Sequence, residues 1–331
     1  MTAITDDGAT GAAHAPFLST DDLHALFAEH TPEPEVLAEN AATGTRVSAG
    51  SIGALDVLLL EAPGGTVFLS RYGAHVLTWR PTDREDALFL SAEAALDGSD
   101  PIRGGIPVCW PWFNLRADPK HGWARRNIWE LDATEANEAN AAVRCRLEVN
   151  GAAATLSVSV DDGLFLELRH DADPAPGTGA ADEVTAALHT YFLVGDYRHT
   201  TVYGIPNGDL DPLFDQAIGP RVFPADGIDT VGYLGIPFER DLQVVDGAAG
   251  GADGSAGGGS AGAPAPGTPG AGTERSWHMV TDASDVVMWN PAAGLADTTA
   301  TAFERFVCVE PARITEPMAP GDVLGLRLEV G

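Results

Sequence analysis

Residues 103–113, RGGIPVCWPWF, join a strong base to glycines, prolines and large aromatic side chains. Gly104 and Gly105 allow backbone angles that other residues avoid, and the prolines fix φ and stiffen the chain. Residues 120–125, KHGWAR, add a lysine, a histidine and an arginine. The two segments predict a rigid, aromatic and cationic loop system that suits a polar ring with a negative group. The same composition also fits a buried loop with a surface arginine, although loops carry function more often than their share.

His189 has a side chain suited to proton transfer. It lies in residues 185–192, TAALHTYF, a segment with strand-like composition. In a strand, alternation puts His189 on one face with Ala187 and Tyr191, and puts Leu188 on the other face. One face can then be core while the other lines a cleft. A lone strand histidine is more often structural, so this residue alone leaves both interpretations open.

Glu310 offers a carboxylate for acid–base chemistry. It closes the apolar run FVCVE and shares a face with Phe306 and Cys308 if that run is a strand. A carboxylate is costly to bury without a partner. Burial would raise its pKa and make it a better base near neutral pH. The alternative is a glutamate at a strand end that reaches water.

The charge of the chain limits its partners. The formal net charge is −29, which argues against nucleic acid and anionic membranes because such a surface repels both. An anionic ligand would therefore need a local group of positive side chains. Arg103, Lys120, Arg125 and Arg126 form the densest such group, and Lys120 is the only lysine.

The sequence predicts that these residues are positioned by β-strands. Residues 143–149, 155–160 and 324–330 alternate strictly between apolar and polar side chains, which is typical of strands with one buried face. Further candidate strands are residues 54–61, 65–70, 73–79, 164–170, 183–193, 200–205, 285–290 and 305–310. Helical periodicity is nearly absent after residue 30. Many short strands with turn signals between them predict an all-β sandwich or barrel.

The N-terminal residues differ from the rest. Residues 1–18 are small and polar, and we expect them to be disordered. Ser19 or Thr20 can cap a short helix with an acidic first turn and an apolar stripe that includes Leu23 and Phe27. We expect this helix to pack on the edge of the sandwich or on a neighbouring chain.

The chain divides into an extension and one domain. Residues 247–273 are almost entirely Gly, Ala, Pro, Ser and Thr, so they cannot bury enough apolar area to offset their ordering entropy. We predict a flexible insertion within a single domain, residues 46–331, which follows an N-terminal extension, residues 1–45. An interdomain linker is the alternative, which we disfavour because only residues 274–331 would follow it.

The sequence argues against several kinds of catalytic or metal site, and against a membrane-spanning or secreted protein. Cys109, Cys145 and Cys308 lie far apart and predict buried free thiols rather than a metal-binding pair. The nucleophile-elbow, P-loop, HExxH and CxxC motifs are absent, and nothing implies a metal or organic cofactor. No apolar run approaches the ~18 residues of a membrane span, and residues 1–15 do not resemble a signal peptide. We therefore expect a cytoplasmic protein.

Five motifs follow one another along the chain: PIRGGIPVCWPWF at 101–113, HGWAR at 121–125, LHTYF at 188–192, WNP at 289–291 and VCVEP at 307–311. In this order and spacing the chain resembles the glucose-6-phosphate 1-epimerases, which are the hexose-6-phosphate mutarotases of the aldose 1-epimerase superfamily. The resemblance covers residues 46–331. It implies a large antiparallel β-sandwich of the galactose-mutarotase type.

The resemblance also implies an activity, the interconversion of the α and β anomers of an aldohexose 6-phosphate, with glucose 6-phosphate as the first candidate. It puts the catalytic pair at His189 and Glu310, with the glutamate as general base and the histidine as the acid that protonates the ring oxygen. A hexose 6-phosphate is the implied partner, and we expect a monomer.

Further binding residues follow from the resemblance. Arg103, Lys120 and Arg125 would hold the phosphate, His121 would hydrogen-bond a sugar hydroxyl, and the tryptophans would stack on the ring. The family's acidic binding position lies in an Asp-Arg motif, whose best local match is Glu239 followed by an arginine. A second departure follows WNP, where many relatives have a further Trp and a Lys and this chain has AAG.

Two other functions remain open at this point. One is an aldose 1-epimerase that acts on unphosphorylated sugars, which would leave the arginines without an anion. The other is a non-catalytic carbohydrate-binding or regulatory protein on the same fold. The presence of both His189 and Glu310 argues against a silent protein.

Overall fold

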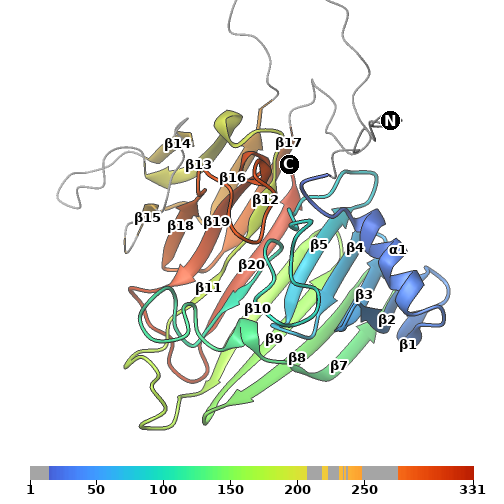
Figure 1. Ribbon diagram of the computed structural model, residues 1–331, viewed down its shortest axis with the longest axis horizontal. Helices are drawn as coiled ribbons and strands as arrows, with labels where there is room; N and C mark the ends of the chain where they lie inside the picture. Colours follow the sequence, from blue (N-terminus) through green and yellow to red (C-terminus); the bar gives the residue numbers. More distant parts are fainter. Residues whose placement is uncertain (1–14, 207–217, 223–230, 234, 236–237, 248–274) are drawn as a thin grey trace, which may run out of the picture.

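The computed structural model describes residues 15–206, 218–222, 231–233, 235, 238–247 and 275–331. In this part of the chain, antiparallel strands form three sheets and one α-helix covers a sheet face (Figure 1). The predicted all-β sandwich with a short N-terminal helix is therefore confirmed. No described helix has the length and apolar character that crossing a membrane requires.

The first sheet follows the chain in simple order, because each strand pairs with the next. Its strands are β1 (Glu35–Asn40), β2 (Thr45–Ile52), β3 (Leu55–Ala62), β4 (Gly65–Ser70) and β5 (His75–Pro81). Strands β3 to β5 are buried at most positions, since both faces of this sheet are covered.

The second sheet is the largest in the described residues and joins distant parts of the chain. In spatial order its strands are β14 (Ile218–Val222), β13 (Thr200–Pro206), β16 (Asp241–Asp246), β17 (Arg275–Thr281), β20 (Val323–Val330), β10 (Leu164–Ala172), β9 (Ala152–Val160), β8 (Ala141–Val149) and β7 (Glu130–Ala136). Buried and accessible positions alternate along β8, β9 and β20, as their sequences predict.

The third sheet carries the candidate catalytic residues. Its strands, in spatial order, are β15 (Val231–Tyr233), β18 (Asp285–Trp289), β19 (Phe306–Arg313), β11 (Ala186–Leu188) and β6 (Val108–Cys109). A further strand, β12 (Tyr191–Leu193), also pairs with β19. Short 3-10 turns complete the described elements at η1 (Ala124–Arg126), η2 (Tyr197–His199) and η3 (Ala302–Arg305).

The main core lies between the large sheet and the other two sheets. Leu60 and Val67 come from the first sheet, Leu156 and Leu166 from the second, and Val309 from the third, and all belong to one buried apolar cluster. Burial of such side chains contributes roughly 1.5–3 kcal/mol each relative to exposure. This shared core fixes the third sheet, and with it β19, against the rest of the sandwich.

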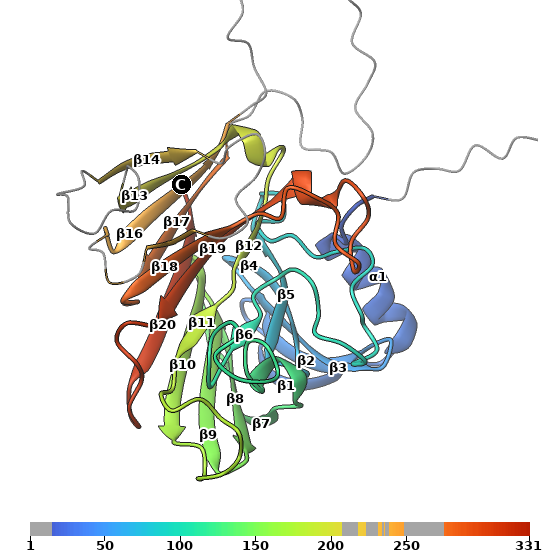
Figure 2. The same cartoon turned by 60° about the vertical axis from the view of Figure 1, so that its left-hand side comes forward.

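The helix α1 (Thr20–His30) covers the other face of the first sheet, outside the sandwich (Figure 2). The Ser19 side chain caps the helix and accepts a hydrogen bond from the backbone of Asp22, as predicted. Leu23 and Phe27 pack against apolar residues of that sheet, including Phe68. The helix thus lies on a sheet face of its own chain, which excludes the sandwich edge as its packing site.

The predicted strands all overlap observed ones, with one change that matters for the site. The segment 183–193 was expected to be one strand but forms two, β11 and β12, separated by His189 and Thr190. At the N-terminus the prediction of disorder is wrong for residues 15–18, because Phe17 is buried and bridges to Ser91. The rest of that segment, residues 1–14, and nearly all of the 247–273 insertion lie outside the described residues.

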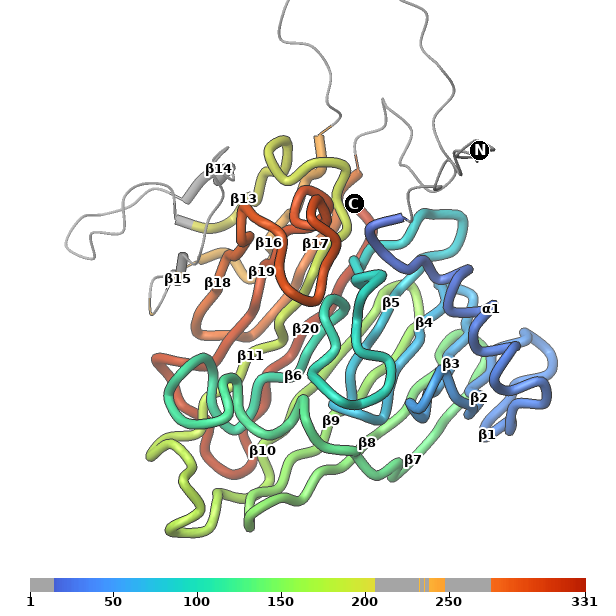
Figure 3. The backbone as a smooth tube through the Cα atoms, in the orientation of Figure 1, coloured from blue at the N-terminus to red at the C-terminus, as the bar shows by residue number. Residues whose placement is uncertain are grey.

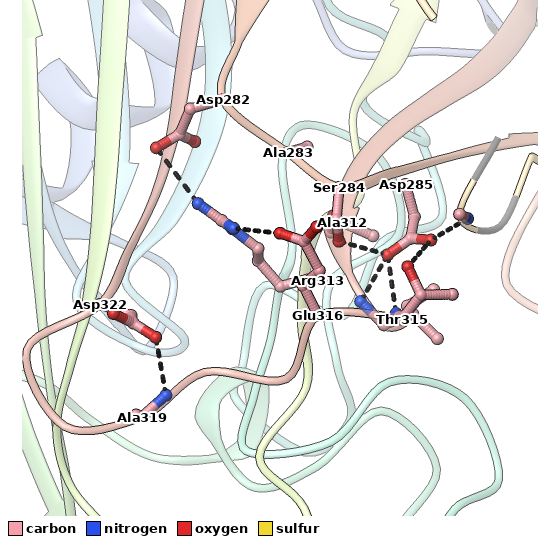
Figure 4. Close-up of polar contacts among 12 residues, drawn as sticks. Asp282, Ala283, Ser284, Asp285, Ala312, Arg313, Thr315, Glu316, Ala319 and Asp322 are labelled. Atoms are coloured by element: carbon pink, nitrogen blue, oxygen red, sulfur yellow. Dashed lines mark hydrogen bonds and ion pairs between the residues drawn. The ribbon is translucent and has the colours of Figure 1, made fainter. Parts of the chain in front are cut away.

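Asp285 ties the start of β18 to the chain that leaves β19 (Figure 4). Its buried carboxylate accepts hydrogen bonds from the backbone N–H groups of Gly235, Ile314 and Thr315 at 2.7–2.9 Å, and from the hydroxyls of Ser284 and Thr315. Burial alone would raise the pKa of Asp285, but these hydrogen bonds outweigh it and hold the pKa below its ordinary value. The ionised carboxylate therefore fixes the ends of the two strands that carry part of the site.

We predict that Asp285→Ala lowers the free energy of unfolding at pH 7 by at least about 3 kcal/mol, because three backbone donors lose their partner. Equilibrium denaturation measures this, with Asp132→Ala as a control that removes only an exposed pair with Arg144. The folded pKa of Asp285 is lowered, so its contribution is present above the unfolded pKa and is lost as pH falls through the folded pKa. Equal stability of the two variants at pH 7 would contradict this role.

Candidate active site

One cavity of about 230 Å³ gathers most of the predicted site residues. The residues that line it are Arg103, Phe113, Asn114, Lys120, His121, Arg125, His189, Val287, Trp289 and Glu310. Segments from four distant parts of the sequence therefore meet here, with β18 and β19 contributing the wall that holds the carboxylate.

Glu239 is the predicted site residue that the structure does not bring to this cavity. It is exposed, and its backbone N–H donates to the carbonyl of Gly204 (2.7 Å). It lies two residues before β16, which belongs to the large sheet, and it is not among the residues that line the cavity. The match on residue type and order alone could not reveal this difference.

His189 and Glu310 lie side by side in the cavity. The Nε2 atom of His189 is 3.3 Å from the Oε1 atom of Glu310. Both residues are buried, with exposed fractions of 8% and 1%. Among the residues that the structure describes, neither the second carboxyl oxygen of Glu310, Oε2, nor the second ring nitrogen of His189, Nδ1, has a hydrogen-bond partner. Buried polar atoms without a hydrogen-bond partner are rare in folded proteins, so these two atoms indicate a site that binds a polar ligand.

The pairing of β19 sets the position of Glu310. Val307 and Val309 point into the main core, while Phe306 and Cys308 belong to a different apolar cluster on the opposite face. Alternation therefore places Glu310 on the second face, as the sequence predicts. Its register partner on β18 is Val287, which also lines the cavity.

His189 occupies the break between β11 and β12. Its backbone N–H donates to the carbonyl of Pro107 (3.0 Å), so residues 103–113 brace it directly. Its ring stacks on Tyr191 with the planes 11° apart and the ring centres 4.8 Å apart. β11, just before the break, pairs with both β6 and β19, so the imidazole follows directly on a strand that is held on both sides.

Burial shifts the pKa values of Glu310 and His189 in opposite directions. Burial raises the pKa of Glu310 well above its ordinary value, although the charge of Lys120 opposes this. Burial lowers the pKa of His189 well below its ordinary value, and the nearby His121, Arg103 and Arg125 lower it further. Both groups therefore favour their neutral forms in the free protein, and such perturbed pKa values are typical of functional sites.

Arg103 is held in a fixed orientation at the cavity. Its Nε donates to Asp297 (2.9 Å) and one terminal nitrogen donates to the hydroxyl of Tyr191 (2.8 Å). The guanidinium also lies over the Trp289 ring, 6.0 Å from its centre. About a quarter of its side chain stays exposed, so part of the guanidinium remains accessible to a ligand.

Lys120, His121 and Arg125 come from the second loop. His121 adopts a positive φ of 65°, and its Nδ1 accepts a hydrogen bond from the backbone of Asn114 (3.2 Å). This assigns the ring proton to Nε2, which can donate to a ligand. Arg125 donates to the carbonyl of Lys120 (3.1 Å), while its buried Nε has no partner within the described part of the chain. Figure 3 shows this loop, in green, close to β6 and β11.

The aromatic contribution differs from the prediction. Trp110 and Trp112 are fully buried in the main core and do not line the cavity, so the expectation that they stack on a sugar ring is wrong. Their function is structural, because the Trp112 indole donates to the carbonyl of Pro119 (2.9 Å) and joins the two loops. Phe113 and Trp289 supply the aromatic walls instead.

Sequence reasoning missed two residues that organise the site. Asp297 and Tyr191 hold Arg103, but the sequence gives no sign of either contact. Asp297 lies almost two hundred positions from its partner, and only the chain reversal after β18 brings them together. Tyr191 belongs to the LHTYF motif, but the motif does not reveal that its hydroxyl accepts a hydrogen bond from Arg103. Asn114, which fixes His121, follows the predicted loop directly and could have been found from that position.

The buried thiols were predicted correctly, and all three cysteines are free and buried. One of them, Cys308, forms with His189 and Glu310 a group whose possible ligand atoms lie within 4.8 Å of one another. Such a set can bind a metal ion. Three cationic side chains line the same cavity, however, so its electrostatics suit an anion better than a divalent cation.

The chain is similar to known aldose 1-epimerases. The model of the aldose 1-epimerase family matches residues 56–213. The chain is 29% identical over 280 residues to a protein of Salmonella typhimurium named "Putative glucose-6-phosphate 1-epimerase", with 80% of this chain and 85% of that protein covered. A protein of Cenchrus ciliaris with the same name is 26% identical over 280 residues, with 76% of each chain covered.

Solved structures share the fold. A crystal structure from Salmonella typhimurium, described as a "putative mutarotase", superimposes with a TM-score of 0.70 at 23% identity, covering 94% of this chain and 98% of that one. The galactose 1-epimerase of Lactobacillus acidophilus gives a TM-score of 0.53 at 11% identity, covering 90% and 98%. The galactose-mutarotase type of sandwich predicted from the motifs is thus confirmed.

The loop that holds Arg103 depends on Gly105, whose φ is 59°. A Cβ atom here would overlap the carbonyl oxygen of Val76. Gly177 also has a positive φ, 80°, but a Cβ there meets nothing within 4 Å. We predict that Gly177→Ala costs only the ~1–2 kcal/mol of a left-handed backbone and that Gly105→Ala costs clearly more. Equilibrium denaturation compares them, and equal losses would show that the loop can move away.

Proposed function

Because the chain belongs to the aldose 1-epimerase family, we propose that it interconverts the α and β anomers of an aldohexose 6-phosphate, with glucose 6-phosphate as its substrate. The observation that carries this proposal is the composition of one cavity. A buried carboxyl–imidazole pair and three cationic side chains line the same space. The pair supplies the acid–base chemistry, and the cations supply a site for the phosphate.

Anomer exchange needs a base and an acid that act at one carbon. Glu310 removes the proton from the hydroxyl on C1, and the electrons of that O–H bond form the aldehyde C=O. The bond between C1 and the ring oxygen breaks, and its electrons take up the proton that His189 donates. The open aldehyde rotates about the C1–C2 bond, and the reverse transfers close the ring on its other face.

The geometry of the pair fits this step. Both oxygens that exchange protons are bonded to C1, so their acid and base must also lie close together. The 3.3 Å between His189 Nε2 and Glu310 Oε1 meets this requirement. A positioned acid or base contributes typically about 10²–10⁴ in rate. Since sugars already change anomers slowly in water, two such groups are sufficient.

The cationic side chains act at the other end of the substrate. Arginine presents a planar fork of donors that suits phosphate oxygens, and the buried Nε of Arg125 is a donor without a partner. Lys120 adds a point charge. His121 is assigned to a sugar hydroxyl, to which its Nε2 donates.

The competing function is epimerisation of unphosphorylated sugars. The unused donor of Arg125 favours an anionic substrate, and so do the relatives named for glucose 6-phosphate. Exchange spectroscopy at anomeric equilibrium tests the choice by comparing catalysed exchange of glucose and of glucose 6-phosphate. Faster catalysed exchange of the phosphate supports the proposal, and equal or faster exchange of glucose overturns it. Exchange of neither sugar would favour a binding protein.

We predict that Glu310→Gln and His189→Ala each lower kcat for glucose 6-phosphate by at least about 10²-fold. Each variant removes one proton-transfer group while leaving the phosphate-binding side chains in place. Steady-state rates measure the loss, and circular dichroism checks the fold. A folded variant with near-normal kcat would remove that residue from the mechanism.

We predict that Arg103→Ala or Arg125→Ala lowers kcat/KM for glucose 6-phosphate about 10- to 150-fold more than for glucose. This range follows from a charged hydrogen bond of roughly 1.5–3 kcal/mol. Arg116→Ala is the control, since Arg116 pairs with Glu183 and lies outside the cavity lining. If both sugars lose equally, the arginines only brace the loops and the proposed phosphate site is wrong.

A further inference from the structure

The positive charges of the cavity do not act equally on the two catalytic candidates. Arg103 and Arg125, together with His121, disfavour the protonated form of His189. Glu310 is influenced instead by Lys120, which favours its ionised form. In the described part of the chain, the other ionisable groups near the pair include the thiols of Cys109 and Cys308 and the phenol of Tyr191, and all three stay protonated because burial raises their pKa values.

A short chain of contacts links the anion site to the imidazole. Arg103 donates to the Tyr191 hydroxyl at 2.8 Å, and the Tyr191 ring stacks directly on the His189 ring. Arg125 lies on the same cavity with its buried Nε unpaired. An anion that binds these two guanidinium groups therefore changes the electrostatic field at His189 without touching it.

The free protein holds the pair in the wrong state for ring opening. The reaction as proposed needs a carboxylate on Glu310 and a proton on His189. Burial favours neutral groups, and the two arginines oppose an imidazolium, so both effects favour the shared proton on Glu310 over His189 in the free protein. Binding of a dianion cancels the charges of Arg103 and Arg125 and makes the imidazolium more favourable.

We propose that the phosphate group of the substrate activates the catalytic pair as well as binding the sugar: on Arg103 and Arg125 it draws the shared proton from Glu310 to His189. The transfer is balanced, since Glu310 loses the proton that His189 gains. The inference rests on the proposed function. It predicts that a separate phosphate dianion activates the protein toward a sugar that carries none.

The test uses D-xylose, which lacks C6 and its phosphate, together with inorganic phosphate at constant ionic strength. Exchange spectroscopy gives the catalysed anomer exchange of xylose with and without phosphate, and the rate without protein is subtracted at each concentration. We expect a saturable rise of at least about tenfold, which corresponds to one pKa unit of redistribution within the pair. Chloride at the same ionic strength should give no rise.

Variants show whether the rise comes from the cavity. The activation ratio, with phosphate over without, should fall close to one in Arg103→Ala and remain unchanged in Arg116→Ala. Phosphorus NMR reports phosphate binding in the same samples. Bound phosphate that leaves xylose exchange unchanged or slows it overturns the inference, and so does a failure of phosphate to bind.

Failure of this inference is distinguishable from failure of the proposed function. Glucose 6-phosphate is measured in the same samples. If it exchanges rapidly while phosphate does not activate xylose exchange, the proposed function stands and the phosphate is only a binding group. If the exchange of glucose 6-phosphate is no faster than that of glucose, the proposed function itself is wrong.

Discussion

The burial of Glu310 beside His189 is the constraint on which the rest of the site depends. A buried carboxyl with one unpartnered oxygen destabilises the fold, and nothing in the main core requires it there. The sandwich tolerates this cost because β19 is held on both sides, by β18 and by β11 and β12. The Asp285 hydrogen bonds then fix the ends of β18 and β19. A site that reduces stability in this way is typical where function needs a perturbed side chain.

The second constraint is charge. The chain carries a net charge of −29, yet one cavity is lined by three cationic side chains with few acidic neighbours. Asp297 is the carboxylate that pairs with Arg103, and it holds the guanidinium by Nε rather than covering it. The loops that carry these residues are joined by backbone and indole hydrogen bonds, so the charges are fixed before any ligand arrives. Such preorganisation reduces the cost of ordering when an anion binds.

The sequence predicted the architecture well where one face of a strand is buried and the other accessible. β8, β9 and β20 alternate for this reason. β7 is an edge strand with several acidic residues, so its sequence shows no clear period, whereas β17 alternates between buried and accessible positions from Trp277 to Thr281. The motif order also predicted residues that the fold brings together, because six of the seven predicted site residues line one cavity.

Where prediction from the sequence failed, three-dimensional information was missing. Aromatic composition suggested that Trp110 and Trp112 face the ligand, but burial decides which face an aromatic ring covers, and both belong to the core. Glu239 was chosen by residue type, and it lies outside the residues that line the cavity. The contacts of Asp297 and Tyr191 with Arg103 connect positions that no local pattern relates.

The protonation state of Glu310 in the free protein tests the central claim most directly. The infrared difference spectrum between the wild type and Glu310→Gln isolates the bands of this one carboxyl group, and it can be followed against pH. The account predicts a protonated-acid band that persists to a pH well above 4.5, the ordinary value for glutamate. A carboxyl that ionises at or below that value would contradict it, because Glu310 would then not be the buried, proton-holding member of the pair.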